Sequence, residues 1–467
     1  MDNSSNNNSG TGLKPEGTPG RGSGRAQFAT RLGVIATTVG SAVGLGNIWR
    51  FPYEAGVHGG GAFMAIYLFF IFVVGVPVVT AEFIIGRSSG ANVYGAFKAL
   101  HSHPFWRVVG GVGILASLMI LSFYSVVAGW TLDYIFRSLQ SFGGESTPAQ
   151  LHAGFTAFSG SWAAVGWTVG FLLLNFLILR RGVQQGIEKV SNVMMPLLFI
   201  ILLVFCANSL LLPGASRGLA FLFKPDFSQV DAGVMIGAMG QAFFSLSLGL
   251  GCLITYSSYF NRQTDLLRSA TVMAGLDTLV AILAGVMIFP AVFTFGGAPE
   301  AGPRLVFETL PSLFMGMPWG MVWSTLFFVL LAIASLTSTI SMSEISIAYF
   351  TEELGMGRTK ATSLNTLIAV VFGTLCSLSF GPLRDVTVCG MTVFDLFDYV
   401  SSNILLPVGG MLISIFAGWV MDRRTRESEL VMTTPWRRAI VTVVVWCMRV
   451  VAPACILLVF LSGLKLI

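Results

Sequence analysis

The segment GSAVGLGNIWRFP, residues 40–52, contains the residue types that point most directly to chemistry. It places three glycines, an asparagine, an arginine and a proline inside a long apolar stretch. Unwinding a helix in a bilayer leaves peptide groups without partners, which costs several kcal/mol for each group unless something else satisfies it. Freed carbonyl oxygens suit a hard cation such as Na⁺, and amide groups at the start of the next helical piece suit a carboxylate. The segment therefore predicts a site for a zwitterionic molecule beside a cation, to which Asn47 adds a side-chain oxygen.

A second segment, SLSLGLG at residues 245–251, interrupts another apolar stretch in the same way. Glycine-rich interruptions at matching positions in two halves of a chain indicate an inverted repeat with a central binding site. The alternative is that the glycines only allow helices to pack closely. For one segment the two interpretations are equally good, whereas two segments separated by half of the chain favour a binding site.

Polar side chains at the expected depth of the bilayer are Glu82, Tyr124, Gln241, Ser245, Asp277, Thr337, Ser338, Thr339, Glu344 and Asp398. A single Ser or Thr carries little information, because in a membrane helix it commonly bonds to its own backbone carbonyls. A carboxylate in the membrane interior is rare and functional by default. Asp277 is the clearest candidate, with a hydrogen-bonded structural carboxylate as the alternative. Arg50, near the outer end of its helix, must pair with an acidic group or reach water.

These residues belong to a chain of 467 residues that is 54% hydrophobic and only 10% charged. Soluble domains carry roughly 25% charged residues, and a run of about 20 apolar residues is long enough to cross a bilayer. The expected spans are 29–54, 61–86, 105–137, 162–180, 190–212, 231–260, 265–296, 319–350, 361–380, 391–421 and 437–464. The sequence thus predicts an all-α integral membrane protein with eleven transmembrane helices.

The loops predict an orientation, because Lys and Arg accumulate on the cytoplasmic side of membrane proteins. With a cytoplasmic N-terminus, nineteen Lys and Arg residues fall in inside regions and seven in outside regions. An odd number of spans then places the C-terminus outside. Residues 1–24 are rich in Asn, Ser, Gly and Pro and are expected to form a disordered cytoplasmic tail. The six cysteines form no CxxC pair, so the sequence indicates neither a metal site nor a disulfide framework.

The first span and its surroundings, RLGVIATTVGSAVGLGNIWRFPYEAGVHGGGAF, resemble the signature of the neurotransmitter:sodium symporter family, most closely its bacterial amino-acid transporters. The segments GRSSG, YSVVAGWTLDY, GQAFFSLSLGLGCLITYSSY and SLTSTISMSEI extend the resemblance from about Arg25 to the C-terminus. It implies the leucine-transporter fold, with inverted five-helix repeats over 25–212 and 231–421, discontinuous helices 1 and 6, and an eleventh helix within 437–467. The implied activity is sodium-coupled import of an amino acid by alternating access through a bacterial inner membrane.

The resemblance implies two sodium ions held by oxygen ligands, which are the ligands that hard cations prefer. The first site comprises the Ala42 carbonyl, Asn47, Ser245, Asp277 and the carboxylate of the substrate. The second site comprises the carbonyls of Gly40, Val43 and Ala334 and the hydroxyls of Thr337 and Ser338. Both sets agree with the chemistry expected of interrupted helices.

The resemblance also implies how an amino acid is bound. Its carboxylate meets the amides of Leu45 and Gly46 and the hydroxyl of Tyr124, and its amino group meets the carbonyls of Ala42, Phe244 and Ser247. Relatives that carry biogenic amines have an Asp where this chain has Gly44, so Gly44 leaves room for the carboxylate of the substrate itself. The side-chain pocket comprises Ile120, Val127, Phe244, Ser247, Leu250, Ser338 and Met342. Because this pocket is apolar and uncharged, we expect hydrophobic or aromatic L-amino acids.

Two gates follow from the same resemblance. Outside, Arg50 and Asp398 are expected to pair above a lid formed by Tyr124 and Phe244. Inside, Arg25 and Glu352 are expected to pair, with Ser258 and Tyr259 nearby, although Glu352 alone is equally described as a solvated loop charge. An exposed ion pair contributes only about 0–1 kcal/mol, which suits a gate that opens in every cycle.

Gly186 and Pro196 mark the fifth span as a segment that can unwind locally, because proline removes a backbone donor. In similar family members this unwinding opens a water path to the inner sodium site. The chloride site of animal relatives corresponds here to Tyr67, Gln241, Ser245, Asp277 and Ala281. A fixed carboxylate at Asp277 supplies the negative charge that chloride brings elsewhere, so no chloride requirement is expected. Proton antiport through Asp277 is a further hypothesis.

Three other classes of protein remain to be separated from a symporter. An ion channel would share the interrupted helices, but rings of identical charged side chains are lacking. A membrane enzyme would need a catalytic or metal-ligand cluster, which the sequence does not indicate. A sensor with a transporter fold would bind sodium and an amino acid without moving them. Nothing in the sequence points to nucleic acid binding or to a particular oligomeric state.

Overall fold

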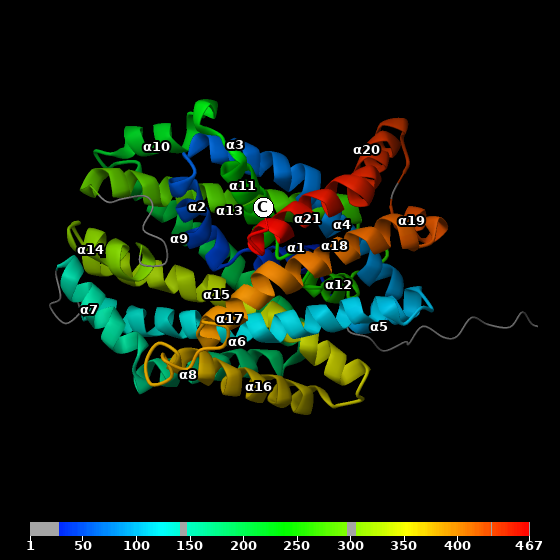
Figure 1. Ribbon diagram of the computed structural model, residues 1–467, viewed down its shortest axis with the longest axis horizontal. Helices are drawn as coiled ribbons and strands as arrows, with labels where there is room; N and C mark the ends of the chain where they lie inside the picture. Colours follow the sequence, from blue (N-terminus) through cyan, green and yellow to red (C-terminus); the bar gives the residue numbers. More distant parts are fainter. Residues whose placement is uncertain (1–27, 141–146, 297–304, 431, 467) are drawn as a thin grey trace, which may run out of the picture.

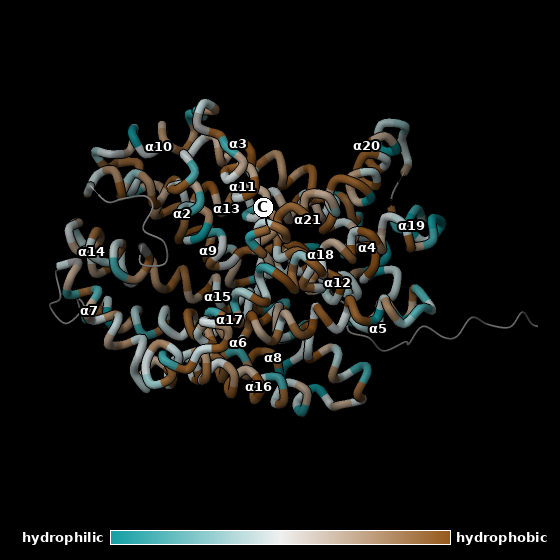
Figure 2. Tube along the Cα trace, in the orientation of Figure 1, coloured by the Kyte–Doolittle hydropathy of each residue, from teal (hydrophilic) through white to brown (hydrophobic). Residues whose placement is uncertain are grey.

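The computed structural model describes residues 28–140, 147–296, 305–430 and 432–466, and within these ranges the regular secondary structure is helical. An isolated bridge between Val388 and Met391 is the only β pairing in the described part of the chain. Figure 1 shows the long helices running side by side in a layered bundle. In Figure 2 hydrophobic residues follow the helices, while hydrophilic residues gather near helix ends and in connecting segments.

The first expected span consists of two helical pieces. The helix α1 (Arg31–Ala42) begins where the Thr30 side chain accepts a hydrogen bond from the Gly33 amide, and it ends at Val43, whose backbone is extended. Helical structure resumes as a π-helical turn at Gly46–Arg50 and continues as α2 (Phe51–Val57). The two pieces are bent by 56° relative to each other.

The remaining helices of the first half are α3 (Gly61–Phe70), α4 (Val76–Ser89), α5 (Val93–Leu100), α6 (Phe105–Leu139), α7 (Pro148–Ser159), α8 (Trp162–Leu179), α9 (Lys189–Ser209) and α10 (Ala215–Phe223). A π-helical turn joins α3 to α4 into the single span Gly61–Ser89, and another precedes α9 to give Val183–Ser209. These bounds agree with the expected second to fifth spans, although the fifth begins earlier than expected.

The helices of the second half are α11 (Ala232–Ser245), α12 (Cys252–Ser257), α13 (Leu266–Phe295), α14 (Leu310–Met315), α15 (Gly320–Glu352), α16 (Arg358–Leu378), α17 (Val393–Tyr399), α18 (Leu406–Ile415), α19 (Arg423–Glu429), α20 (Pro435–Trp446) and α21 (Ala452–Gly463). The elements from α17 onward to Val420 form one span, and α20 and α21 form another. The expected span 231–260 is divided between α11 and α12.

Among the described residues, nine helices are long and apolar enough to cross a membrane, or ten if the bent pair at residues 31–57 counts as one span. The expected sixth span is not among them, because neither α11 nor α12 is by itself long enough to cross a membrane. The outer surfaces of the spans are apolar, as contact with lipid requires. Ile200 and Leu203 of α9, for example, are more than half exposed. The chain is therefore built to pass through a membrane several times.

The bundle is held by close contacts between helices, with α6 and α15 packed along each other at its centre. The tightest approaches use glycine. At Gly86 of α4, an added Cβ atom would lie 2.0 Å from the carbonyl oxygen of Ile254 in α12. Because that neighbour is backbone, it cannot move aside as a flexible side chain would, and this position admits only glycine.

We therefore expect Gly86→Ala to destabilise the protein by about 1–3 kcal/mol, the usual range for overpacking. The matched control is Gly275→Ala in α13, where an added Cβ atom meets nothing within 4 Å. Thermal unfolding of the purified variants in detergent measures both effects. Equal melting temperatures for the two variants would show that α4 and α12 are not packed as described.

Candidate functional site

The break between α11 and α12 is formed by residues in the left-handed backbone region. Ser247, Gly249 and Gly251 have φ angles of 52°, 84° and 77°. An added Cβ atom on Gly249 would lie 2.3 Å from the carbonyl oxygen of Leu406, so a larger residue does not fit there. The fully buried carboxylate of Glu82 accepts a hydrogen bond from the Gly249 amide at 2.9 Å, which gives the freed peptide group a partner inside the protein.

A cluster of polar side chains joins the first break to the second and to α13. The Asn47 side-chain amide donates to Ser245 Oγ at 3.0 Å and to Asp277 Oδ1 at 2.8 Å. Ser245 Oγ in turn donates to Asp277 Oδ2 at 2.6 Å. All three residues are buried. The structure thus brings together the three side chains expected at the first sodium site, with the Asn47 amide nitrogen facing the other two and its oxygen accepting from the Gly44 amide.

A second oxygen-rich cluster lies where the end of α1 meets α15. Ser338 Oγ donates to the carbonyl of Val43 at 3.1 Å, and Thr337 Oγ1 donates to the carbonyl of Ala334 at 3.1 Å. An added Cβ atom on Gly40 would lie 3.4 Å from the Thr337 side chain. All five residues expected at the second sodium site are therefore gathered around this junction.

A cavity between the two breaks contains most of the residues expected to bind an amino acid. Its lining is Ala42, Gly44, Gly46, Ile120, Phe123, Tyr124, Phe244, Ser245, Ser247, Leu250, Ser338, Met342 and Leu406. Of the expected substrate residues, Leu45 and Val127 do not line it. Leu45 still faces the site through its amide, which donates to the Tyr124 hydroxyl at 3.0 Å. Val127 is buried in α6.

Phe123 and Leu406 line the cavity although the sequence did not single them out. Both are ordinary apolar residues, and each reaches the cavity because its helix passes beside a break.

The space around Gly44 is restricted. An added Cβ atom there would lie 2.6 Å from Ser338 Oγ and 2.8 Å from the Tyr124 hydroxyl. A side chain at residue 44 would therefore collide with these two hydroxyl groups, so only glycine fits at this point of the cavity wall.

The outer gate residues do not pair directly in this conformation. Arg50 lies 3.6 Å from Glu54, one helical turn away, and its guanidinium group lies over the Phe244 ring at 4.1 Å from the centroid. Asp398 accepts a hydrogen bond from Ser402 at 2.9 Å. The expected Arg50–Asp398 contact is thus replaced by a local carboxylate and an aromatic face, neither of which the sequence analysis considered.

Glu54 also contacts His58, the first residue after α2. His58 Nδ1 lies 3.4 Å from a Glu54 oxygen, and this hydrogen bond raises the pKa of His58. His58 and Arg50 therefore both lie beside one carboxylate at the outer end of the broken span.

The expected inner gate is described only in part. Arg25 lies outside the described residues, while Glu352 accepts hydrogen bonds from the backbone and side-chain amides of Asn92 at 2.8 and 2.9 Å. Ser258 bonds to the carbonyl of Thr255 within its own turn. Tyr259 donates to Glu344 at 2.9 Å and so connects α12 with α15.

The strongest buried ion pair at this end is one that the sequence analysis missed. Arg358 donates to the two carboxylate oxygens of Glu344 at 2.8 and 2.6 Å and also to the carbonyl of Leu179 in α8. The Glu344 side chain is completely buried. Glu344 was recognisable as a carboxylate at membrane depth, but Arg358 stands at the start of its helix, where a solvated cation is the ordinary expectation.

The segment that contains Gly186 and Pro196 is helical throughout. Gly186 lies in a π-helical turn (Val183–Glu188), and Pro196 lies inside α9. Next to Gly186, the Glu188 carboxylate accepts hydrogen bonds from the amides of Ala29 and Thr30 at 2.9 and 3.2 Å. The start of α1 is therefore tied to the very part of the fifth span that was expected to unwind.

Two counterparts of the animal chloride site, Tyr67 and Ser245, are connected to Asp277 through hydrogen bonds. The Tyr67 hydroxyl donates to Ser245 Oγ at 3.4 Å, and the Gln241 side chain donates to the Gly46 carbonyl at 3.2 Å. Asp277 supplies a carboxylate to this group, and Ala281 of the same helix is buried. These residues together form a polar group with one carboxylate, that of Asp277.

Two interrupted helices that meet at an oxygen-lined cavity inside an apolar bundle define a multi-pass membrane transporter. The comparisons with known proteins identify its family: residues 25–144 and 150–467 match the sequence profile of the sodium:neurotransmitter symporter family, and the chain belongs to that family. This is a family of transporters and not of enzymes.

Individual relatives agree with this assignment. The chain is 37% identical to the uncharacterized sodium-dependent transporter YhdH of Bacillus subtilis, over 93% of this chain and 97% of that protein. It is 31% identical to the uncharacterized sodium-dependent transporter MJ1319 of Methanocaldococcus jannaschii, over 88% of this chain and 87% of that protein. Its fold matches the crystal structure of MhsT in complex with L-phenylalanine with a TM-score of 0.85 and 42% identity, over 94% of this chain and 100% of that one.

We expect Arg358→Met to lower the free energy of unfolding by about 3–5 kcal/mol, because it leaves the buried Glu344 carboxylate without its cation. The double variant Glu344→Gln/Arg358→Met should recover much of that loss. Lys360→Met, which removes an exposed cation from the same helix, is the control. Thermal unfolding measures all three, and an equal effect of the two single Met variants would contradict the buried pair.

Proposed function

We propose that this protein is a sodium-coupled symporter that imports hydrophobic or aromatic L-amino acids by alternating access. The observation that carries the proposal is the meeting of the two helix breaks at one cavity, where backbone groups outside regular helix and side-chain oxygen atoms lie close together. Residues 25–212 and 231–421 form the two inverted repeats, with discontinuous helices 1 and 6, and 437–467 supplies an eleventh helix.

Two sodium sites are proposed, at the two oxygen clusters. The first uses Asn47, Ser245, Asp277 and the Ala42 carbonyl, and the carboxylate of the substrate completes it. The second uses the carbonyls of Gly40, Val43 and Ala334 together with Thr337 and Ser338. Support comes from the donor sets, which contain only oxygen, as a hard cation requires. In the first site the substrate itself is a ligand, so sodium and amino acid bind cooperatively.

The amino acid is proposed to lie with its carboxylate at the start of the second half of the broken first span. There the Leu45 amide and the Tyr124 hydroxyl already face each other at 3.0 Å, and a carboxylate can accept from both. The partial positive charge of a helix N-terminus adds to this preference. The substrate side chain points to Ile120, Phe123, Leu250 and Met342, whose apolar surfaces exclude a charged group.

Asp277 is proposed to act as the fixed negative charge of the first site, so that chloride is not required. The carboxylate lies within 2.8 Å of both Asn47 and Ser245, where it offsets the charge of a bound cation. The gates are proposed at Arg50 with Asp398 outside and at Arg25 with Glu352 inside. When the outer gate closes, Arg50 exchanges Glu54 for Asp398. Unwinding between Gly186 and Pro196 then releases the inner sodium ion.

The proposed location is a bacterial inner membrane, with the N-terminus cytoplasmic and the C-terminus outside. The support is the distribution of Lys and Arg residues, which are concentrated on the side of residues 1–24.

The proposal is tested by uptake into proteoliposomes and by thermal shift across the twenty common amino acids. We expect Leu, Met, Phe, Tyr or Trp to raise the melting temperature in Na⁺ but not in K⁺, because a ligand that binds the folded state stabilises it. Uptake should follow an inward Na⁺ gradient and saturate. Accumulation that survives replacement of Na⁺ by K⁺ would refute the symporter, and sodium-dependent binding without uptake would identify a sensor.

The role of Asp277 is tested separately with Asp277→Asn, which retains the shape of the side chain and removes its charge. We expect transport either to be lost or to become dependent on chloride, since chloride can supply the missing charge. Uptake is measured in chloride and in gluconate. Full activity of the variant in gluconate would contradict the fixed-charge role, while leaving sodium coupling itself intact.

A further inference from the structure

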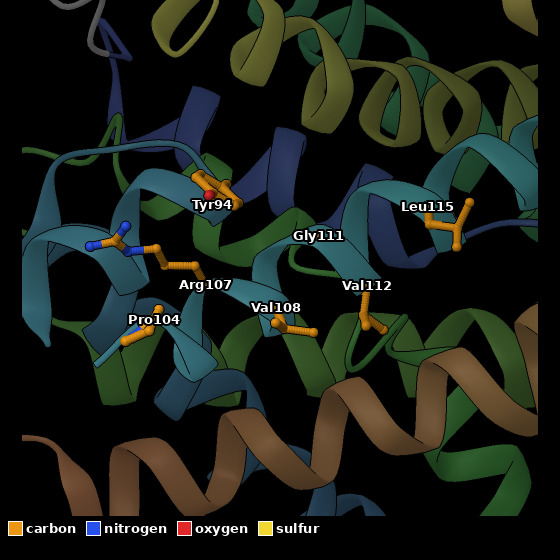
Figure 3. Close-up of a pocket in the computed structure, with 7 residues that line it drawn as sticks. All are labelled: Tyr94, Pro104, Arg107, Val108, Gly111, Val112 and Leu115. Atoms are coloured by element: carbon orange, nitrogen blue, oxygen red, sulfur yellow. The ribbon is translucent and has the colours of Figure 1, made fainter. Parts of the chain in front are cut away.

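A groove on the outer surface of α6 lies well outside the proposed transport site. Tyr94 of α5, Pro104 and the first half of α6 line this open groove, whose volume is about 400 Å³. Figure 3 shows the α6 residues of its lining, Arg107, Val108, Gly111, Val112 and Leu115, in a row along the helix, with Tyr94 beside the Arg107 end. This groove takes no part in the binding of sodium or of an amino acid.

The wall of the groove has the character of a surface that contacts lipid. Val108 and Leu115 are 57% and 51% exposed, and they belong to a helix apolar enough to span a membrane. Residues 108, 111, 112 and 115 follow helical spacing and therefore share one face. Between them Gly111 leaves the floor open, because an added Cβ atom there would meet nothing within 4 Å. Its neighbour Gly110, in contrast, lies directly against the backbone of Tyr94.

One end of this apolar groove carries a cation without an acidic partner. Arg107 forms no ion pair with any described carboxylate, and its buried Nε has no hydrogen-bond partner. Two other arginines near helix ends do have acidic partners: Arg87 pairs with Glu429, and Arg437 pairs with Asp265. A buried guanidinium nitrogen without an acceptor is costly, and an anion in the groove would remove that cost.

We propose that this groove binds an anionic phospholipid, with the phosphate at Arg107 and one acyl chain lying along α6 over Gly111. The apolar floor selects a hydrocarbon chain, and the unpaired guanidinium selects a negative headgroup over a zwitterionic one. The orientation in the proposed function places this end of α6 at the cytoplasmic leaflet, where anionic lipids attract basic side chains. The site itself depends only on the groove and would stand if the transported substrate were different.

The experiment measures lipid retention by native mass spectrometry of the purified full chain, released from nanodiscs of equal parts phosphatidylglycerol and phosphatidylcholine. The wild type should retain phosphatidylglycerol about fivefold more than phosphatidylcholine, the factor expected for one well-placed arginine. Arg107→Gln should abolish this preference. Gly111→Leu should reduce retention of both lipids, because its side chain fills the open floor without meeting the protein.

Matched controls separate the groove from general surface effects. Gly170→Leu adds the same side chain to an exposed glycine of α8 that also meets nothing within 4 Å, and Arg424→Gln removes another cytoplasmic-side cation. Both should retain lipid as the wild type does. Equal retention of the two lipids by the wild type would overturn the proposal, as would groove variants that behave like their controls. Binding is measured without transport, so failure of the symporter proposal leaves this result readable.

Discussion

Peptide groups released inside a bilayer must find partners, and the structure is organised around meeting this requirement at two places. The Gly249 amide bonds to Glu82, the Leu45 amide bonds to Tyr124, and the Gly44 amide bonds to the Asn47 side chain at 3.0 Å. On the acceptor side, the Val43 carbonyl receives Ser338. Each broken helix is thereby stable without water, which is what allows irregular backbone to exist at this depth.

The partners that stabilise the breaks are also groups that a ligand can replace or share. Tyr124, Asn47 and Ser338 are neutral, so an arriving carboxylate or cation exchanges one hydrogen bond for a stronger, charge-assisted interaction. Glu82 is different, because its carboxylate faces a backbone amide and not the cavity lining. Glu82 therefore keeps its backbone partner when a ligand binds, whereas Tyr124 and Ser338, which line the cavity, can exchange theirs for the proposed substrate or ion.

The parts of the site that could be predicted from the sequence are those set by residue type at a fixed position along the chain. The glycines at residues 40, 44, 46, 249 and 251 predicted both interruptions, and the family resemblance predicted most of the cavity lining. Contacts that depend on how helices face one another were missed. Phe123 and Leu406 are indistinguishable in sequence from other apolar residues, and only the register of their helices brings them to the cavity.

Charged residues were misjudged for a related reason. Arg50 was assigned to a distant carboxylate, although Glu54 follows one turn later and Phe244 offers a ring face. The spacing of four residues between Arg50 and Glu54 is visible in the sequence and permits an ion pair on a helix. Whether Arg50 pairs with Glu54 or with a distant carboxylate, however, depends on the conformation of the gate. Arg358 was not singled out, because its position at a helix start carries no sign of burial.

The two ends of the cavity therefore differ in the strength with which they are held. At the outer end Arg50 and Glu54 lie 3.6 Å apart on successive turns of one helical segment, so this pair, which contributes about 0–1 kcal/mol, does not join two helices. At the inner end hydrogen bonds continue from Phe28 to Tyr259, from Tyr259 to Glu344, and from Arg358 to Glu344 and α8. Disrupting a buried pair costs about 3–5 kcal/mol. In the proposed transport cycle the inner end is therefore the one that costs more free energy to open, and ligand binding is the step that supplies it.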